Sequence, residues 1–429
     1  MNPSMKSAPG VLRAGLATVA CLALGVVAGC GKGDPAGSGT QSIVPASEVP
    51  GGAGGVDILF MIDNSSSMTS MQQKLVAQIP MFLQTLQSAA QPLSDFHIAV
   101  VSSDMGAPGD ATASIGCTAE GDQGIFQSQP RGDCQGALAP GASYISNVGG
   151  VANYTGQLTD VLACITPLGA NGCGFEHQLA SVARALGADG QPAPTANAGF
   201  LRQDAELAIF LLTNEDDCSA PADTRLYSLN GAGQNLANPL GPIANYRCNQ
   251  FGHLCRDPGS ADPTALGKPP LNPPSDAQGS SDSPTLNLAD CESNDTSSGL
   301  LTPVSQFIAE IKALKADPSK ITVGALIAPA APYTVEWLPS TGQEGPSEIW
   351  PSIEHSCGPQ SDISVNPLAT DLTTDGSFGD PAVRITQWVQ AFGDNGVIGS
   401  ICDDYGLTMG SMAGKVIANR GALPDAGTD

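Results

Sequence analysis

Five runs of apolar residues constrain the fold of this chain more than any other feature. Each run is as long as a typical strand and carries few polar residues, which is typical of strands that are buried on both faces. They lie at 57–63, 97–104, 206–214, 321–328 and, with a weaker pattern, 397–402. Helical patterns separate them, and this alternation indicates a parallel sheet covered by helices on both faces. The sequence therefore predicts a doubly wound α/β fold with a mostly parallel sheet.

The predicted helices are five segments in which apolar residues recur at helical spacing. Pro80 lies inside the first of them, and we expect it to kink that helix or to interrupt its hydrogen bonds. Pro303 comes just before the third, where a helix start favours proline. The five segments are 68–86, 175–186, 304–314, 385–392 and 409–417. We expect their methionine and aromatic residues to lie in the core.

Three of the predicted strands end in polar residues. Asp63, Asp104 and Asn214 stand at the carboxyl ends of the first three runs. In open α/β sheets, ligands bind outside the carboxyl ends of the strands. We therefore expect these side chains to converge on one crevice.

The first strand leads directly into the sequence Asp63-Asn64-Ser65-Ser66-Ser67 and then into a helix. One carboxylate and two hydroxyls at every second position can point at a single hard cation, and such a cation prefers oxygen ligands. A helix cap is the alternative, since Ser and Asp also favour a helix N-terminus. Capping explains only one of these residues. The pattern indicates a site for a divalent cation such as Mg²⁺, Mn²⁺ or Ca²⁺.

This motif, together with the order of strands and helices, resembles the von Willebrand factor type A family. The resemblance extends from Val56 to about Ala418. We assign residues 56–422 to such a domain. The resemblance implies a doubly wound sheet whose upper edge binds a divalent cation. It also implies that a carboxylate of a partner protein completes the coordination of the metal. The family's first metal-site motif matches residue by residue at Asp63, Ser65 and Ser67.

Two other elements of the family's metal site differ here. The family offers a Thr before the helix that is predicted to begin near Phe175, whereas this chain reads Asn-Gly-Cys-Gly-Phe-Glu over 171–176, so Glu176 takes the place of that ligand. The family's Thr-Asp-Gly becomes Thr-Asn-Glu, with Asn214 in the position of the Asp and with Asp216 or Glu215 available to restore the charge. The resemblance thus gives the predicted metal ligands Asp63, Ser65, Ser67, Asn214, Glu176 and Asp216, with Asp104 as an auxiliary group.

The acidic run 215–217 is followed by Cys218, and in this it resembles Cys-rich variants of the domain in soil-dwelling, myxobacterial-like deltaproteobacteria. The run either binds a second cation such as Ca²⁺ or is a solvated loop. The sequence does not decide between these two interpretations.

The N-terminus has the pattern of an export signal. Lys6 and Arg13 precede an uncharged stretch that ends at Gly29, and this stretch is too short for a working membrane span. The residues before Cys30 resemble a bacterial lipobox, which implies that residues 1–29 are removed and that Cys30 carries acyl chains. Several acyl chains on one residue anchor a protein stably to a membrane. Gly31 at the second mature position points to the outer membrane, and a plain secreted protein is the alternative.

Four other segments lie outside the predicted helices and strands. Residues 31–55 are rich in Gly, Ser and Pro and predict a flexible tether after Cys30, and residues 423–429 predict a disordered tail. Two long stretches, at about 218–300 and 329–380, fit no regular element. Such stretches in a compact domain are functional or disordered loops. We interpret them as insertions into a single domain.

Ten cysteines remain after Cys30, and an even number in an exported chain predicts five disulfides. Spacing favours Cys117 with Cys134 and Cys164 with Cys173, and Cys357 with Cys402 would join two late segments. No Cys-x-x-Cys pair occurs, so a zinc cluster is not expected. The ten are Cys117, Cys134, Cys164, Cys173, Cys218, Cys248, Cys255, Cys291, Cys357 and Cys402.

The chain is strongly acidic, and this limits its partners. Removal of Lys6 and Arg13 with the signal changes the formal net charge from −24 to −26. A chain with this charge does not bind nucleic acid by electrostatic attraction. We expect cations or cationic surfaces as compatible partners, and contact with a membrane only through the lipid anchor.

The sequence leaves three functions to compare. The first is a lipid-anchored binding module of the cell envelope that captures a partner protein through a divalent cation. The second is a metal-free structural scaffold, which the changes at Gly174 and Asn214 favour. The third is an exported hydrolase, but no Gly-x-Ser-x-Gly or His-Glu-x-x-His motif accompanies the four histidines His97, His177, His253 and His355. We therefore expect no enzymatic activity.

Overall fold

The computed structural model describes most of the chain from residue 54 to residue 421. Residues from Gly51 onward belong to one compact unit. The predicted signal, the lipidated Cys30, nearly all of the tether and the predicted tail lie outside the described residues. The described ranges are 54–88, 93–111, 116–131, 134, 137–229, 231–275, 277–280, 283–339 and 349–421.

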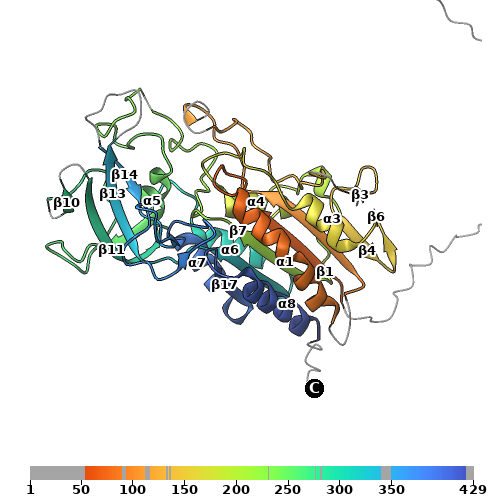
Figure 1. Cartoon of the computed structure of the whole chain (residues 1–429). Coiled ribbons are helices and arrows are strands. Elements are labelled where there is room, and N and C mark those ends of the chain that lie inside the picture. The colour runs from red at the N-terminus through yellow and green to blue at the C-terminus, as the bar shows by residue number, and fades with distance from the viewer. Residues whose placement is uncertain are drawn as a thin grey trace, which may run out of the picture. The chain divides into compact units, whose positions relative to one another are not determined.

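The main sheet has seven strands in the order β17-β12-β7-β1-β2-β4-β5. All five predicted strands are in it and run parallel, so the prediction of a central, mostly parallel sheet is confirmed (Figure 1). In sequence order they are β1 (Val56–Ile62), β2 (Phe96–Ser102), β7 (Glu206–Leu212), β12 (Ile321–Ile327) and β17 (Gly396–Ser400). The hairpin of β4 (Ile145–Val148) and β5 (Val151–Ala152) extends the sheet in the antiparallel direction.

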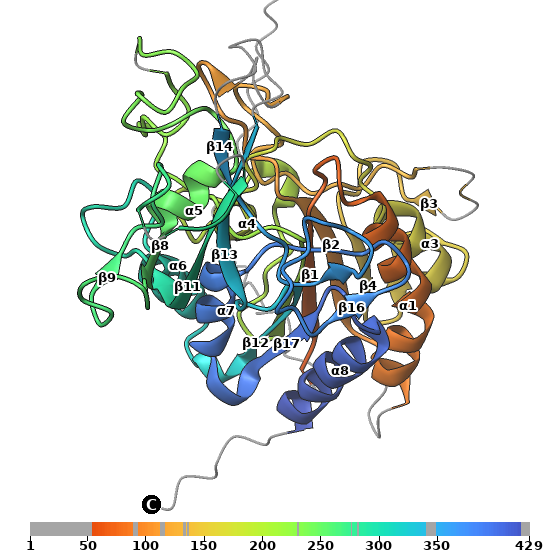
Figure 2. The same cartoon turned by 60° about the vertical axis from the view of Figure 1, so that its left-hand side comes forward.

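The four central strands are mainly apolar because their side chains alternate between two hydrophobic cores, one on each face of the sheet. Phe60 of β1 packs with α1 (Thr69–Gln87), α3 (Leu158–Ile165) and α8 (Tyr405–Gly421) on one face of the sheet. Leu59 packs with α4 (Gln178–Leu186), α6 (Val304–Lys312) and α7 (Val383–Gln390) on the other face. In Figures 1 and 2, α1 and α8 lie side by side. All five predicted helices are present.

The start of one helix differs from its prediction, and the effect of Pro80 on the first helix is confined to a missing backbone hydrogen bond. Helix α1 continues without a break through Pro80. Pro80 is exposed, so water can reach the carbonyl group that lacks its amide donor. Helix α4 begins at Gln178, three residues later than the apolar pattern suggests, because Phe175 packs against the loop around Tyr227.

The two stretches that we expected to be irregular form a second sheet, so that expectation is wrong. The sheet has six antiparallel strands, with β11 from the first stretch paired to β13 from the second (Figure 2). Buried residues such as Leu286 and Trp337 fill its core. Its strands are β8 (His253–Arg256), β9 (Leu266–Gly267), β10 (Gln278–Ser280), β11 (Ser283–Ser293), β13 (Tyr333–Pro339) and β14 (Ile349–Ile353).

Short elements complete the fold. Helix α5 (Tyr246–Gly252) precedes β8. The remaining elements are the strands β3 (Ala137–Leu138), β6 (Tyr154–Thr155), β15 (Gly358–Pro359) and β16 (Leu372–Thr373), and the 3₁₀ turns η1 (Thr195–Asn197), η2 (Pro318–Lys320) and η3 (Gly393–Asn395).

Five disulfides connect these elements, as the even number of cysteines predicts. Cys357 is bonded to Cys402, which confirms the expected pair. The other two expected pairs are wrong, because Cys117 is bonded to Cys173 and Cys134 to Cys164. The remaining bonds are Cys218–Cys248 and Cys255–Cys291.

Glu336 and Glu354 lie next to each other on one face of the second sheet. Glu336 of β13 is paired with Ser352, and Glu354 follows two residues after Ser352. Both glutamates are buried. Burial raises the pKa of Glu354 to about 7, and the neighbouring Glu336 adds to the increase. The ionised form of Glu354 is therefore disfavoured in the folded protein.

We expect the substitution Glu354→Gln to stabilise the protein in a pH-dependent way. The pKa of Glu354 is higher in the folded protein than in the unfolded chain, so wild-type stability falls as the pH rises from about 4.5 to about 7. Glutamine does not titrate, so the variant should gain about 1–2 kcal/mol over wild type at pH 8 and little at pH 5. Urea unfolding at both pH values measures this. Glu120→Gln, at an exposed position, is the control, and a gain that does not change with pH would contradict the assignment.

Candidate metal centre

Three of the predicted ligands follow β1 at the carboxyl edge of the main sheet. Asp63 is fully buried, and its Oδ1 accepts a hydrogen bond of 2.8 Å from the backbone amide of Ser65. The Oγ atoms of Ser65 and Ser67 are 3.4 Å apart. The turn between β1 and α1 therefore places one carboxylate and two hydroxyls together.

Asn214 reaches the same group from the neighbouring strand. It follows β7, and its Oδ1 accepts a hydrogen bond of 3.0 Å from the hydroxyl of Ser67. Asn214 is buried, and its Nδ2 has no hydrogen-bond partner among the described residues. Four predicted ligands, Asp63, Ser65, Ser67 and Asn214, are thus brought together.

Two further residues contact Asp63 that the sequence analysis did not single out. Thr213 donates a hydrogen bond of 2.7 Å to Oδ2 of Asp63, and Ser103 donates one of 3.2 Å to Oδ1. Both residues directly follow strands that flank β1. Their position at the strand ends is the feature of the sequence that could have identified them as neighbours of Asp63. Burial raises the pKa of Asp63, and the hydrogen bonds from Ser65, Thr213 and Ser103 oppose that increase.

Two glutamates, the buried Glu176 and the partly buried Glu215, adjoin this group. Glu176 precedes α4, and its Oε1 has no hydrogen-bond partner among the described residues. Burial, with Glu215 and Asp63 as the charged neighbours, raises the pKa of Glu176 well above its usual value. Burial, with Asp380 and Asp63 nearby, raises the pKa of Glu215 to about 8. The region thus gathers several acidic groups whose ionised forms are disfavoured in the folded protein.

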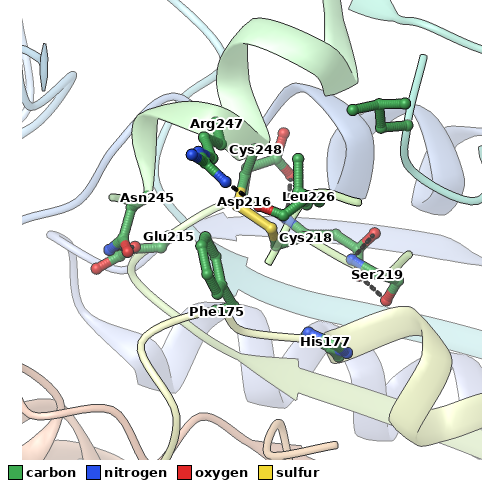
Figure 3. The surroundings of a disulfide bond; sticks show 12 residues. Phe175, His177, Glu215, Asp216, Cys218, Ser219, Leu226, Asn245, Arg247 and Cys248 are labelled. Carbon is green, nitrogen blue, oxygen red and sulfur yellow. Dashed lines mark hydrogen bonds between the residues drawn. A yellow bond between two sulfur atoms is a disulfide. The ribbon is translucent and has the colours of Figure 1, made fainter. Parts of the chain in front are cut away.

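A cavity of about 10 Å³, enough for one water-sized particle, lies beside the two glutamates. Glu176, Glu215, Asp380 and Asn245 are among the residues that line it. Asn245 donates a hydrogen bond of 2.6 Å to Glu215, and Figure 3 shows these two side chains pointing toward each other.

Asp216 borders the same cavity, but its carboxylate is engaged elsewhere. Its Oδ2 accepts hydrogen bonds from His253 and from the backbone amide of Arg384, at 2.8 and 2.7 Å. Its Oδ1 accepts from the amides of Asp217 and Ile385. Burial tends to raise the pKa of Asp216, but the bond from His253 and the charge of Arg384 outweigh it, and the pKa is lowered. Asp216 thus holds the start of α7 and is not directed at Asp63.

Asp104, predicted as an auxiliary group, also has its carboxylate engaged in another contact. Its Oδ1 accepts a hydrogen bond of 2.9 Å from the amide of Gly106. Burial raises its pKa, and the bond from Gly106 opposes that increase. Asp104 therefore shapes the loop after β2.

Disulfides fix the loops around the centre. Cys117–Cys173 holds the segment before Glu176, and in that segment the amide of Gly172 donates a hydrogen bond of 2.7 Å to the carbonyl of Asn64. A Cβ atom at Gly172 would lie 2.3 Å from the side chain of Asn64, so a larger residue here would force Asn64 to move. Cys218–Cys248 joins the chain after β7 to α5 (Figure 3).

The four histidines have partners other than serine. His97 contacts the carbonyl of Phe200, and His177 contacts the hydroxyl of Tyr227. His253 lies between Asp216 and Tyr333, and His355 is paired with Asp380. None of these contacts has the geometry of a serine nucleophile with its base.

The donor set at Asp63 fits a hard cation. It offers one carboxylate, two hydroxyls and an amide oxygen, and the unpartnered Oε1 of Glu176 is a further oxygen nearby. Within the described part of the chain, no group of three or more His, Cys, Asp or Glu side chains is arranged to hold a metal ion. A cation here would therefore depend on Ser65, Ser67 and Asn214 as well as on acids.

No protein-family model matches the sequence, and no curated protein matches it significantly. Among solved structures, the pilus adhesin SpaC from Lactobacillus rhamnosus GG, in its open conformation, is 12% identical with a TM-score of 0.32, over 85% of this chain and 30% of that chain. The pilus adhesin RrgA from Streptococcus pneumoniae is 12% identical with a TM-score of 0.26, over 64% of this chain and 39% of that chain. This chain thus spans well under half the length of either adhesin, and such TM-scores do not establish a common fold.

Within the described ranges, no helix is both long enough and apolar enough to cross a bilayer.

Proposed function

We propose that this protein is a lipid-anchored binding module of the cell envelope with a von Willebrand factor A-like domain. Asp63, Ser65, Ser67 and Asn214 would hold a divalent cation, with Glu176 as a further oxygen ligand. The cation would supply an open coordination position, and a carboxylate of a partner protein would fill it. The function is adhesion or protein capture, without catalysis.

One observation carries this proposal. Asp63 and Asn214 are far apart in sequence, yet the serine pair joins them at the carboxyl edge of β1 and β7 through contacts of 2.8, 3.4 and 3.0 Å. All four oxygens come from rigid parts of the sheet and the first turn toward α1. Such oxygens suit Mg²⁺, Mn²⁺ or Ca²⁺.

The local charge supports a cation at this place. Asp63, Glu176 and Glu215 interact electrostatically, and burial together with mutual repulsion disfavours their ionised forms. Buried charges in proteins are usually paired or bound to metals. A divalent cation would relieve this repulsion and would engage the free Oε1 of Glu176.

The cellular location is part of the same proposal. Five disulfides form and persist in oxidising compartments outside the cytosol. The lipobox-like sequence before Cys30 would then direct acyl chains to Cys30, and these chains would anchor the protein to the outer membrane. Labelling with a radioactive fatty acid, lost in Cys30→Ala, tests this part.

Thermal unfolding of the oxidised chain lacking residues 1–30 tests the metal centre. We expect the melting temperature to rise in Mg²⁺, Mn²⁺ or Ca²⁺ relative to chelator, since a ligand at a hundredfold excess over Kd adds about 2.7 kcal/mol to stability. The rise should vanish in Asp63→Asn and persist in Asp160→Asn, which removes an exposed acid. The absence of a rise with every ion would refute the metal centre.

A metal-free scaffold is the second candidate, and one observation favours it. The hydroxyl of Ser67 donates directly to Asn214, and both oxygens of Asp63 already accept hydrogen bonds. These contacts satisfy the group without a metal. A scaffold would bind its envelope partners equally well in chelator, whereas the metal-dependent module would release them.

A further inference from the structure

The edge strand β17 lacks the features that protect the other edges of the two large sheets. It has five residues, Gly-Val-Ile-Gly-Ser, with no proline and no charged side chain. By contrast, β5 and β9 have two residues each, β10 has three, and β14 contains Pro351. Proteins blunt sheet edges with short strands, prolines and charges, because an open edge can pair with another chain.

The open strand is also accessible. Every residue of β17 is at least partly exposed, and the side chain of Ile398 is 43% exposed. Beyond the strand, at the start of α8, Leu407 is 78% exposed. The edge therefore offers both backbone groups and apolar contacts to a partner.

A groove of about 540 Å³ lies beside this edge. Its walls come from β17, from the chain after β12, from Thr386 and Gln390 of α7, and from Leu407 and Thr408 of α8. The groove stands at the carboxyl ends of β12 and β17, on the far side of β7 from Asp63. It is therefore separate from the candidate metal centre.

The charge of the groove indicates the kind of segment that fits it. Asp371, Asp403 and Asp404 line it, and the described lining contains no lysine, arginine or histidine. Among the described residues, none of the three acids is in an ion pair. Asp404 accepts a hydrogen bond of 2.9 Å from the amide of Gly406, so one of its oxygens faces α8. A cationic side chain would find three carboxylates within one groove.

We propose that β17 and this groove bind an extended, basic segment of a partner protein. The segment adds a strand to the free edge of β17 through backbone hydrogen bonds, as in β-augmentation. Its lysine or arginine side chains lie near Asp371, Asp403 and Asp404, and its apolar side chains contact Ile398 and Leu407. This binding does not depend on the metal centre.

The test uses a labelled, acetylated heptapeptide of alternating valine and lysine, with fluorescence anisotropy at low salt as the measurement. We expect it to bind the oxidised chain, in chelator as well as in Mg²⁺. A valine–glutamate peptide of the same length should not bind. A valine–lysine peptide with proline at two central positions should bind at least tenfold more weakly, because it cannot complete the strand pairing.

Matched variants separate the groove from the overall negative charge. The triple variant Asp371→Asn, Asp403→Asn, Asp404→Asn should weaken binding about tenfold. The control triple Glu120→Gln, Asp160→Asn, Asp223→Asn removes the same charge from exposed positions outside the groove and should change binding less than about twofold.

A second measurement locates the peptide on the protein. Bound peptide should slow amide hydrogen exchange within Gly396–Ser400 and leave β5 unaffected. Equal weakening by the two triple variants, undiminished binding of the proline peptide, or unchanged exchange in β17 would each overturn the proposal. The melting-temperature response to cations is independent of these outcomes, so the two proposals can fail separately.

Discussion

Replacement of Arg384 by methionine should lower the free energy of unfolding by about 3–5 kcal/mol, which is the range for removing one partner of a buried ion pair. Arg384 and Asp217 are both fully buried, and Nη2 lies 3.0 Å from Oδ2. The guanidinium also donates hydrogen bonds to the hydroxyl of Ser293 and the carbonyl of Thr302. Methionine fills a similar volume but leaves the carboxylate of Asp217 buried without its cation.

Urea unfolding measures this loss, and a surface pair provides the control. Arg256 is paired with Asp290 on the exposed side of the second sheet. Arg256→Met should cost less than about 1 kcal/mol, because solvent screens that pair. A loss below 1 kcal/mol for Arg384→Met would show that the guanidinium of Arg384 does not stabilise the buried carboxylate of Asp217.

Replacement of Phe60 by alanine should lower the free energy of unfolding by about 3–5 kcal/mol. Phe60 is buried in the central strand β1, with ring centroids 5.7 Å from Phe82 and 5.6 Å from Phe210. The substitution opens a cavity between β1, α1 and β7, and the rigid elements around it can close that cavity only in part.

The matched variant for this position is Phe60→Leu. Leucine retains most of the apolar volume, so its cost should be clearly smaller than that of alanine. Chemical unfolding of the two variants, followed by intrinsic fluorescence and by circular dichroism, gives both values. Equal losses would mean that the aromatic contacts with Phe82 and Phe210, and not the cavity, determine the stability at Phe60.

The main sheet could be predicted because its strands carry their signal locally. A strand such as β7 is buried on both faces, so its sequence after Glu206 is apolar without interruption. The second sheet is different. Residues Leu286 and Leu288 of β11 are buried and alternate with polar neighbours, which is the pattern of a strand with one covered face. That alternation was a usable signal, but it lies among proline-rich and cysteine-rich segments that indicate loops.

The disulfide pairs depend on tertiary structure that spacing does not contain. Cys117 and Cys134 are close in sequence, but the loop after β2 takes Cys117 to the segment before Glu176. Cys134 instead meets Cys164 at the end of α3. The order of the strands in the sheet decides which loops meet, and the spacing of the cysteines does not reveal that order.

The acidic run after β7 shows the same limit within the candidate site. The sequence presents Glu215, Asp216 and Asp217 as one cluster, but the structure separates their roles. Glu215 faces Asn245 beside Glu176. Asp216 contacts His253 of β8 and accepts from the first amides of α7, and Asp217 binds the side chain of Arg384 in α7. Adjacent residues point in different directions, so a ligand set cannot be read from adjacency alone.

The second sheet has a consequence for how the chain is made and how it can change. The partner of β11 is β13, and α6 and β12 lie between them in the sequence. During folding, the first insertion therefore keeps an open edge until the second insertion pairs with it, and Cys255–Cys291 can hold β8 against β11 in the meantime. Deletion of either insertion would leave the strands of the other without a pairing partner. The two insertions should therefore be gained or lost together in related proteins.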